Sequence, residues 1–343
     1  MEDALFLRLV RIATGGADRF DAPPSDAEWD ALQKTAREQA VEGVLCGALE
    51  RLPKEQLPSG DRLRRWLSAR TVIVRRNALM DARAQQLTGI VAGLGLRSAV
   101  LKGQGVARCY PDPGLRVSGD IDIWIPGGRE KVLATLKGRV PLRRPVYHHV
   151  EAKFFGDIEV EVHFLPAFLY CPWRNRALQR WFDAEAQAWD MADADGFVYP
   201  KPAFAAVFSL VHISKHIINE GVGLRQIMDH HYVMQSLPEA DREGVRATVR
   251  SLGLEPLGGA LEEVETALFG APGCPGLFGP QPRRGARLLE DMLLSGNFGK
   301  GDSRPGGKRA RFFRLLPDYP SEVLWSPVWK VWHRIWRKRR GYL

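Results

Sequence analysis

The chain has 343 residues, 45% of them hydrophobic and 26% charged, with a mean hydropathy of −0.23. These values are typical of a globular protein and exclude disorder as its main state. No apolar run approaches the ~20 residues of a membrane-spanning helix, and Met1-Glu2-Asp3 lacks the basic start of a signal peptide, so we expect a cytoplasmic protein. The four cysteines lie far apart without a CxxC pair, which predicts free thiols.

The net charge of +9 is concentrated at the C-terminal end. From residue 301 onward there are eleven Lys or Arg residues and three acids, a net charge of +8. The preceding 300 residues therefore carry about +1. Attraction to an anionic partner is thus expected of the tail, and the body gives no indication of nucleic-acid binding.

The predicted elements divide the chain into three segments. Residues 1–95 read as helices, with a capped start at Ser25 and a long helix from Asp61 to about Leu94. Residues 96–170 carry short β-like runs at 98–101, 120–125, 145–155 and 157–164, with short helices at 106–110 and 129–136. Residues 171–343 return to helices, at about 175–182, 201–219, 223–236, 239–252, 256–268 and 282–294. This order predicts an α+β fold with a small mixed sheet.

Two carboxylates stand two residues apart in an apolar strand, at Asp120 and Asp122. Strand alternation places both on one face. Like charges on one half-buried face repel each other unless a cation lies between them. Oxygen ligands alone favour Mg²⁺ or Mn²⁺ over zinc, so the pair predicts a divalent-metal site.

The next β-like run supplies further acidic groups. Glu159, Glu161 and His163 alternate along it and share a face. In a two-ion phosphoryl-transfer site, Glu161 or Glu159 would be the third ligand and a candidate base, with His163 close behind them or at the incoming hydroxyl. An exposed edge strand is the structural alternative for this pattern.

Upstream, a predicted strand ends in Lys102-Gly103-Gln104-Gly105. Glycine permits close approach of backbone N–H groups to a phosphate, and Lys102 adds a positive charge. The segment matches neither GxGxxG nor a Walker A loop. Arg116 and Ser118, just before Asp120, could also reach a triphosphate. Each feature alone could be an ordinary turn or strand, but their order within about 65 residues indicates nucleotide chemistry.

These segments resemble the uncharacterised bacterial nucleotidyltransferase family of the polymerase-β superfamily. The resemblance rests on residues 100–105, 110–113, 115–122 and 160–164, and residues 147–151 and 171–176 look like the version in Bacteroidetes-type members. The likeness covers roughly 80–340. It implies the minimal nucleotidyltransferase fold in residues 96–170, with NTP and Mg²⁺ as cofactors and transfer of a nucleoside monophosphate as the reaction.

By position, the resemblance assigns Gly103 to the phosphate loop, Asp120 and Asp122 to the metal-binding pair, and Glu161 to the third carboxylate. One departure is Lys102-Gly103-Gln104 where the superfamily has a Gly-Ser turn. The resemblance also includes the helix near residues 211–229, which makes Lys215 and Arg225 candidates for phosphate or substrate contacts.

Two helical patterns leave alternatives open. His212 and His216 lie one turn apart, and a structural or nucleotide-facing role is favoured over a zinc site. Arg225 and Asp229 are spaced for a helix ion pair, with Arg225 facing the cleft as the alternative.

The tail also leaves its role open. Trp325, Trp329, Trp332 and Trp336 form one helical stripe before Arg337-Lys338-Arg339-Arg340. This stripe could cap the helical core, associate peripherally with an anionic membrane through 321–343, or stack on a nucleic acid or nucleotide sugar.

The predicted activity is Mg²⁺-dependent transfer of a nucleoside monophosphate to an acceptor hydroxyl, with release of pyrophosphate. The acceptor is open: a protein, a sugar, another small molecule or an RNA end would all be compatible. A catalytically silent, antitoxin-like nucleotide-binding module and a membrane-peripheral scaffold are the alternatives.

Overall fold

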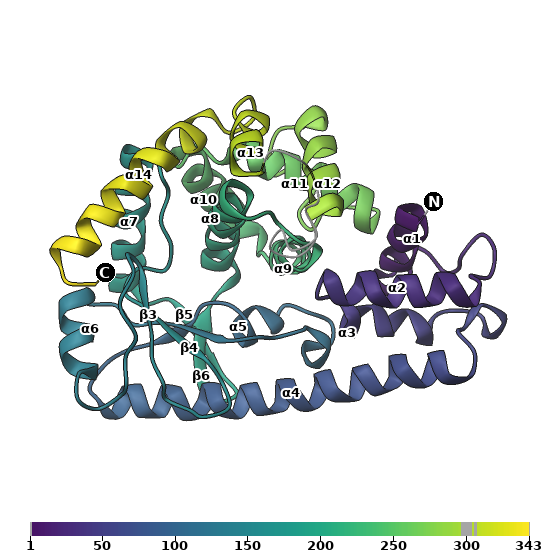
Figure 1. The fold of residues 1–343 in the computed structure, drawn as a ribbon, viewed down its shortest axis with the longest axis horizontal. Coiled ribbons are helices and arrows are strands. Elements are labelled where there is room, and N and C mark those ends of the chain that lie inside the picture. The colour runs from purple at the N-terminus through teal and green to yellow at the C-terminus, as the bar shows by residue number, and fades with distance from the viewer. Residues whose placement is uncertain (1, 296–303, 305–306, 343) are drawn as a thin grey trace.

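The structure is a computed structural model that describes residues 2–295, 304 and 307–342. Its N-terminal part contains α1 (Glu2–Thr14), α2 (Asp26–Glu38), α3 (Glu42–Leu45) and α4 (Gly60–Gly93). As predicted, α2 starts at a capping box, in which the Ser25 hydroxyl accepts from the Glu28 amide and the Glu28 carboxylate accepts from the Ser25 amide. The 34-residue α4 runs along one side of the molecule, beneath the sheet in Figure 1.

The central sheet has four strands in the order β1-β2-β4-β3. These are β1 (Ala99–Val100), β2 (Ile121–Trp124), β3 (His149–Glu151) and β4 (Val160–His163), with α5 (Gln104–Ala107) and α6 (Arg129–Leu136) between them. Strands β2 and β4 are parallel, whereas β1 and β3 pair antiparallel with their neighbours. The prediction of a small mixed sheet is therefore confirmed.

A second, two-stranded sheet was not predicted. Strands β5 (Met191–Ala194) and β6 (Phe197–Pro200) form an antiparallel hairpin. Its turn is Asp195-Gly196, with φ of +53° and +78°. An Asp-Gly pair between two short strands is a strong signal for a two-residue hairpin, so this dipeptide could have revealed it.

Apart from this hairpin and the connecting loops, the described residues of the C-terminal part are helical. It comprises α7 (Pro172–Ala188), α8 (Pro202–Asn219), α9 (Leu224–Gln235), α10 (Glu239–Ser251), α11 (Glu255–Phe269), α12 (Pro282–Ser295), α13 (Gly307–Leu315) and α14 (Pro320–Arg339). These helices cover the side of the sheet opposite α4, and α14 ends near α6 (Figure 1), where Arg340 pairs with Glu130 at 3.1 Å. Among the described helices, none has the length and apolarity needed to cross a membrane.

Two hydrophobic clusters hold these layers together. One joins the N-terminal helices to α7–α11, so that Leu9 of α1 and Leu261 of α11 belong to the same core. The other lies between the sheet, α6 and the second half of α4, and contains Leu87, Ile123 and Val162. The α+β architecture is thus a sheet held between the long helix and the helical C-terminal part. The cysteines Cys46, Cys109, Cys171 and Cys274 are free thiols, as predicted.

Candidate active site

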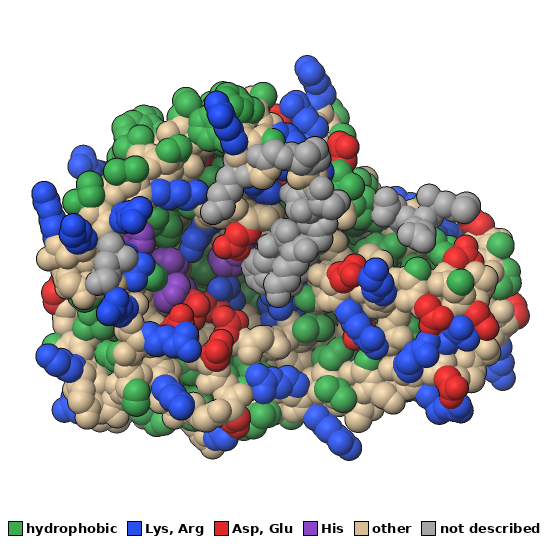
Figure 2. Space-filling view, in the orientation of Figure 1, with side chains coloured by type: hydrophobic (Ala, Val, Ile, Leu, Met, Phe, Trp, Pro, Cys, Tyr) green, Lys and Arg blue, Asp and Glu red, His purple; other side chains and the backbone are tan. Residues whose placement is uncertain are grey.

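A cleft of about 550 Å³ lies between the central sheet and helices α8 and α9. Figure 2 shows histidine and acidic side chains gathered in one hollow of the surface, with Lys and Arg around them. Such a volume suits a small-molecule ligand. The predicted site residues that line this cleft are Lys102, Gly103, Arg116, Asp120, Asp122, Glu159, Glu161, His163, Lys215 and Arg225.

The parallel pairing of β2 and β4 brings the carboxylates together. Asp122 is the register partner of Glu161. Asp120 and Glu159 immediately precede these strands, and the Ile121 amide donates to the Glu159 carbonyl at 3.0 Å. The negative charge of Asp122, and then burial, raise the pKa of Asp120. The carboxylates therefore repel one another and favour a cation between them.

Asp122 is almost fully buried and has two nitrogen partners. Its carboxylate lies 2.8 Å from Lys102 Nζ and 2.9 Å from His163 Nε2. Burial alone would raise the pKa of Asp122, but Lys102 and His163 hold it well below its usual value. Burial likewise opposes the charge on Lys102, yet Asp122 and Asp120 raise the pKa of that lysine. Both groups are thus charged at neutral pH.

The turn after β1 places backbone next to the carboxylates. Gly103 has φ of +59° and ψ of −112°, and a Cβ added there would lie 3.5 Å from the Asp120 carbonyl. The helix that follows was predicted at 106–110, but α5 spans Gln104–Ala107. The Gln104 side-chain amide donates to Asp81 of α4 at 3.1 Å, so that side chain is engaged at α4.

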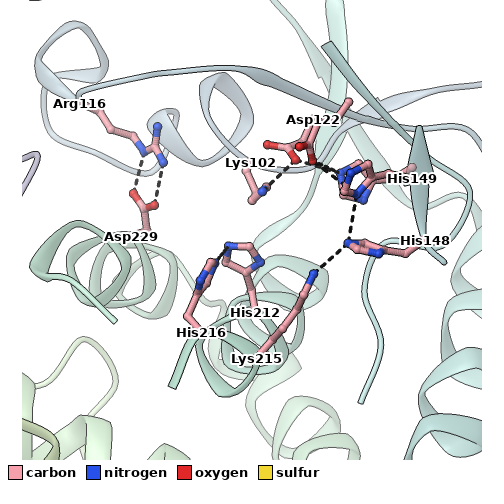
Figure 3. Close-up of polar contacts among 11 residues, drawn as sticks. Lys102, Arg116, Asp122, His148, His149, His212, Lys215, His216 and Asp229 are labelled. Carbon is pink, nitrogen blue, oxygen red and sulfur yellow. Dashed lines mark hydrogen bonds and ion pairs between the residues drawn. The ribbon is translucent and has the colours of Figure 1, made fainter. Parts of the chain in front are cut away.

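Arg116 is buried and engaged with α9. Its guanidinium donates two hydrogen bonds of 2.7 Å to the Asp229 carboxylate, which also accepts from the Tyr110 hydroxyl at 2.6 Å (Figure 3). The Ser118 hydroxyl accepts from Arg116 at 3.3 Å. This bidentate pair fixes the segment before Asp120 to α9, a link between residues 113 positions apart that spacing could not predict.

Arg225 of α9 faces the cleft, which was the alternative to a helix ion pair with Asp229. It lines the cleft, and its guanidinium donates to the Val117 carbonyl at 3.2 Å. Burial, and then the charge of Arg116, lower the pKa of Arg225. Arg225 thus contributes positive charge near Asp120, as the cleft-facing interpretation expects.

The structure adds two histidines that sequence reasoning missed as site residues. His149 is the first residue of β3 and His148 precedes it. The antiparallel register sets His149 opposite His163. His148 Nε2 lies 2.8 Å from Lys215 Nζ and 3.1 Å from His149 Nδ1, as Figure 3 shows. A His-His pair in the β-like run before ExExH was the available signal, but only the register places it in the cleft.

His212 and His216 of α8 also line the cleft. Their Nε2 atoms lie 2.9 Å apart. Burial, and then Lys102, hold the pKa of His212 well below its usual value. Lys215, one turn from His212, has its pKa lowered to about 8 by burial and by Lys102. This face of α8 therefore presents one ammonium and neutral imidazoles to the cleft.

The donor set fits a divalent ion. Ligand atoms of Asp122, Glu161 and His163 all lie within 4.8 Å of one another, and Asp120 lies two residues before Asp122. Burial opposes ionisation of Glu161, but a hydrogen bond with His163 lowers its pKa. Ionised carboxylates facing a cleft are the ligands that Mg²⁺ and Mn²⁺ prefer, and here an imidazole accompanies them.

Comparison with known proteins identifies a family. Residues 25–261 match the family described as "Uncharacterised nucleotidyltransferase", which covers most of the chain, including the whole sheet and helices α8 to α10. The match begins earlier and ends earlier than the resemblance expected from the motifs. No curated protein matches the chain. The chain therefore belongs to this uncharacterised nucleotidyltransferase family, and its activity is that of a transferase.

Proposed function

We propose that the protein transfers a nucleoside monophosphate from an NTP to an acceptor hydroxyl and releases pyrophosphate. The observation that carries this proposal is the convergence of Asp120, Asp122 and Glu161 on one cleft beside the Gly103 turn. The acceptor oxygen attacks the α-phosphorus, the bond from that phosphorus to the bridging oxygen breaks, and pyrophosphate leaves. Such a reaction is catalysed by positioning and by charge neutralisation.

Asp120, Asp122 and Glu161 would hold Mg²⁺, or Mn²⁺ in its place. When bound, this ion supplies neutralisation of phosphate charge and orientation of the reacting oxygens. Lys102, the Gly103 backbone, Lys215 and Arg225 surround the same cleft and would bind phosphate oxygens. Glu161 is the candidate acceptor of the hydroxyl proton, because it is ionised at neutral pH and lies half-exposed at the cleft. Arg116 and Ser118 would position Asp120 through Asp229.

The test is incubation of the purified chain with each α-³²P-labelled NTP, Mg²⁺ and candidate acceptors or a cell extract, with pyrophosphate measured in parallel. Asp120→Asn should abolish label transfer. Asp157→Asn is the matched control, since Asp157 is an exposed carboxylate in the same region that pairs with Arg83, and it should leave transfer unchanged. NTP binding without label transfer or pyrophosphate release in the wild type would instead identify a silent regulatory module.

One face of α14 favours a second function, peripheral contact with an anionic membrane. Most of the tryptophan stripe is packed: Trp329 stacks on Phe168 with ring centroids 4.4 Å apart, and Trp325 packs against Trp173, whereas Trp332 is 44% exposed. Also exposed are Leu324 (55%), Val328 (54%), Val331 (62%) and Ile335 (49%). Their spacing of four, three and four residues makes one aliphatic stripe.

Exposed basic side chains of Arg334, Lys338 and Arg339 accompany this stripe. An apolar stripe flanked by Lys and Arg suits a helix lying in the surface of an anionic bilayer. Phosphatidylserine vesicles should therefore bind the full chain, less so at high salt, and Val331→Asp/Ile335→Asp should abolish binding. Val72→Asp, at an exposed valine of α4 (66%), is the matched control. Equal binding to phosphatidylcholine vesicles, or none to either, would refute the membrane role.

A further inference from the structure

The nitrogen donors at the β3–β4 end of the cleft form a cluster that the nucleotide chemistry does not require. His148 Nε2 lies 3.1 Å from His149 Nδ1, which lies 3.6 Å from Glu161 Oε2; this oxygen lies 3.3 Å from His163 Nε2. The three histidines come from β3, β4 and the residue before β3. Four potential ligand atoms thus follow one another in an unbroken chain of short contacts.

The spacing of these atoms is that of ligands around one ion. Metal–ligand bonds of about 2.1 Å place neighbouring ligands roughly 3.0–3.4 Å apart, from octahedral to tetrahedral geometry. The contact of 3.1 Å between His148 Nε2 and His149 Nδ1 already lies in this range. The ligand atoms of His148, His149 and His163 lie within 4.8 Å of one another.

The surroundings also suit a cation. The Nδ1 atoms of His148 and His163 are buried and have no hydrogen-bond partner among the described residues. At one end of the chain of donors, Lys215 Nζ lies 2.8 Å from His148 Nε2. A bound ion would replace the Lys215 contact and leave that lysine facing the cleft.

We propose that His148, His149 and His163 form a second metal centre, which binds a first-row transition ion of the Mn²⁺, Co²⁺ or Zn²⁺ type rather than Mg²⁺. Imidazole nitrogen suits these ions, whereas Mg²⁺ binds oxygen ligands and keeps several waters. The inference rests on the proposed function only in assigning Asp120, Asp122 and Glu161 to the Mg²⁺ of the nucleotide. This centre lies beside the oxygen-ligated site expected from the sequence, which did not consider β3.

Metal binding without nucleotide tests this centre directly. The full chain, stripped of metal with a chelator and dialysed, is titrated with Co²⁺ alone while visible absorption is recorded, and with Mn²⁺, Zn²⁺ and Mg²⁺ in a calorimeter. We expect one equivalent of Co²⁺ or Zn²⁺ to bind at least about 100-fold more tightly than Mg²⁺. Affinity for Co²⁺ no greater than for Mg²⁺ would overturn the proposal.

Variants then identify the ligands. His149→Gln should weaken Co²⁺ binding at least about tenfold. His212→Gln is the matched control, because it removes another imidazole of the same cleft, one that contacts His216, and should leave Co²⁺ affinity unchanged. Equal affinities in both variants and the wild type would refute the assignment.

Two further measurements keep the result interpretable. Electron spin-echo spectroscopy of the wild-type protein with Mn²⁺ should detect coupling to imidazole ¹⁴N, and its absence would overturn the proposal without any variant. Asp120→Asn should lose nucleotidyl transfer but retain Co²⁺ affinity. A wild-type protein that binds Co²⁺ but transfers no nucleotide would refute only the proposed function. One that transfers nucleotides but does not bind Co²⁺ would refute only this centre.

Discussion

Asp122 and Glu161 stand directly opposite each other on the parallel strands β2 and β4, and His163 contacts both carboxylates, at 2.9 and 3.3 Å. The two positions differ in burial, since the Asp122 side chain is 2% exposed and that of Glu161 is 27% exposed. One pair of acids can therefore contribute similarly to catalysis and unequally to stability.

Asp122→Asn and Glu161→Gln should each reduce nucleotidyl transfer by about 100-fold or more. Asp122→Asn should also lower the free energy of unfolding by about 3 kcal/mol, because it leaves the partly buried Lys102 ammonium without the counter-charge that lies 2.8 Å away. Glu161→Gln should lower the free energy of unfolding by clearly less than this. Urea denaturation of both variants, beside transfer assays, measures the difference; equal losses of stability would show that the Lys102–Asp122 contact is not structural.

The buried Arg116–Asp229 pair should stabilise the folded protein. Asp229→Asn leaves the Arg116 guanidinium uncompensated, which should cost about 3–5 kcal/mol of unfolding free energy. Glu255→Gln, which breaks the exposed ion pair with Arg250, should cost less than about 1 kcal/mol. If Asp229→Asn weakened NTP binding while leaving the denaturation midpoint unchanged, Arg116 would contact the nucleotide instead, as its sequence position first indicated.

Gly103 should be intolerant of a side chain. Its positive φ is strained for other residues, so Gly103→Ala should cost about 1–3 kcal/mol and reduce NTP affinity by distorting the turn. Gly119→Ala serves as control, because Gly119 lies beside Asp120, has open space around an added Cβ and has no positive φ. Calorimetric NTP binding and thermal unfolding compare the two; equal behaviour would mean that the turn does not depend on glycine.

The two faces of α14 should respond differently to truncation. Trp329→Ala removes the stack on Phe168 and the edge contact with Tyr147, and should destabilise the protein by about 3 kcal/mol. Leu324→Ala, on the exposed stripe, should change stability by less than about 0.5 kcal/mol. Comparable losses from both substitutions, measured by chemical denaturation, would place the exposed stripe in a packed interface.

The packing of α14 should also weaken in mild acid through His333. This imidazole stacks on Trp329 with centroids 4.6 Å apart, and burial, then Arg337 and Arg129, lower its pKa to about 4. Because the unfolded state binds the proton at about pH 6.5, this contribution is complete above that pH and is lost as the pH falls toward 4. His333→Gln should therefore lose less unfolding free energy than the wild type between pH 7 and pH 5. An identical pH profile would contradict this effect.

Local patterns in the sequence were sufficient for much of the fold. The capping box at Ser25, the helix at Arg129–Leu136 and the β-like runs around Asp122 and Glu161 depend on neighbours within a few residues, and the structure has them as predicted. Strand alternation likewise gave the shared face of the acidic residues, because a period of two follows from backbone geometry alone.

The sequence by itself therefore determined the acidic strands, the glycine turn and the helical segments. Only the tertiary structure decided that His149 faces His163, that Arg116 is bound by Asp229, and that α14 packs Trp329 inward and turns its aliphatic stripe outward. Local elements follow from short-range sterics and hydrogen bonding, whereas these relationships join residues far apart in the chain. They follow from strand register and from which surfaces become buried together, and no short window of sequence contains that information.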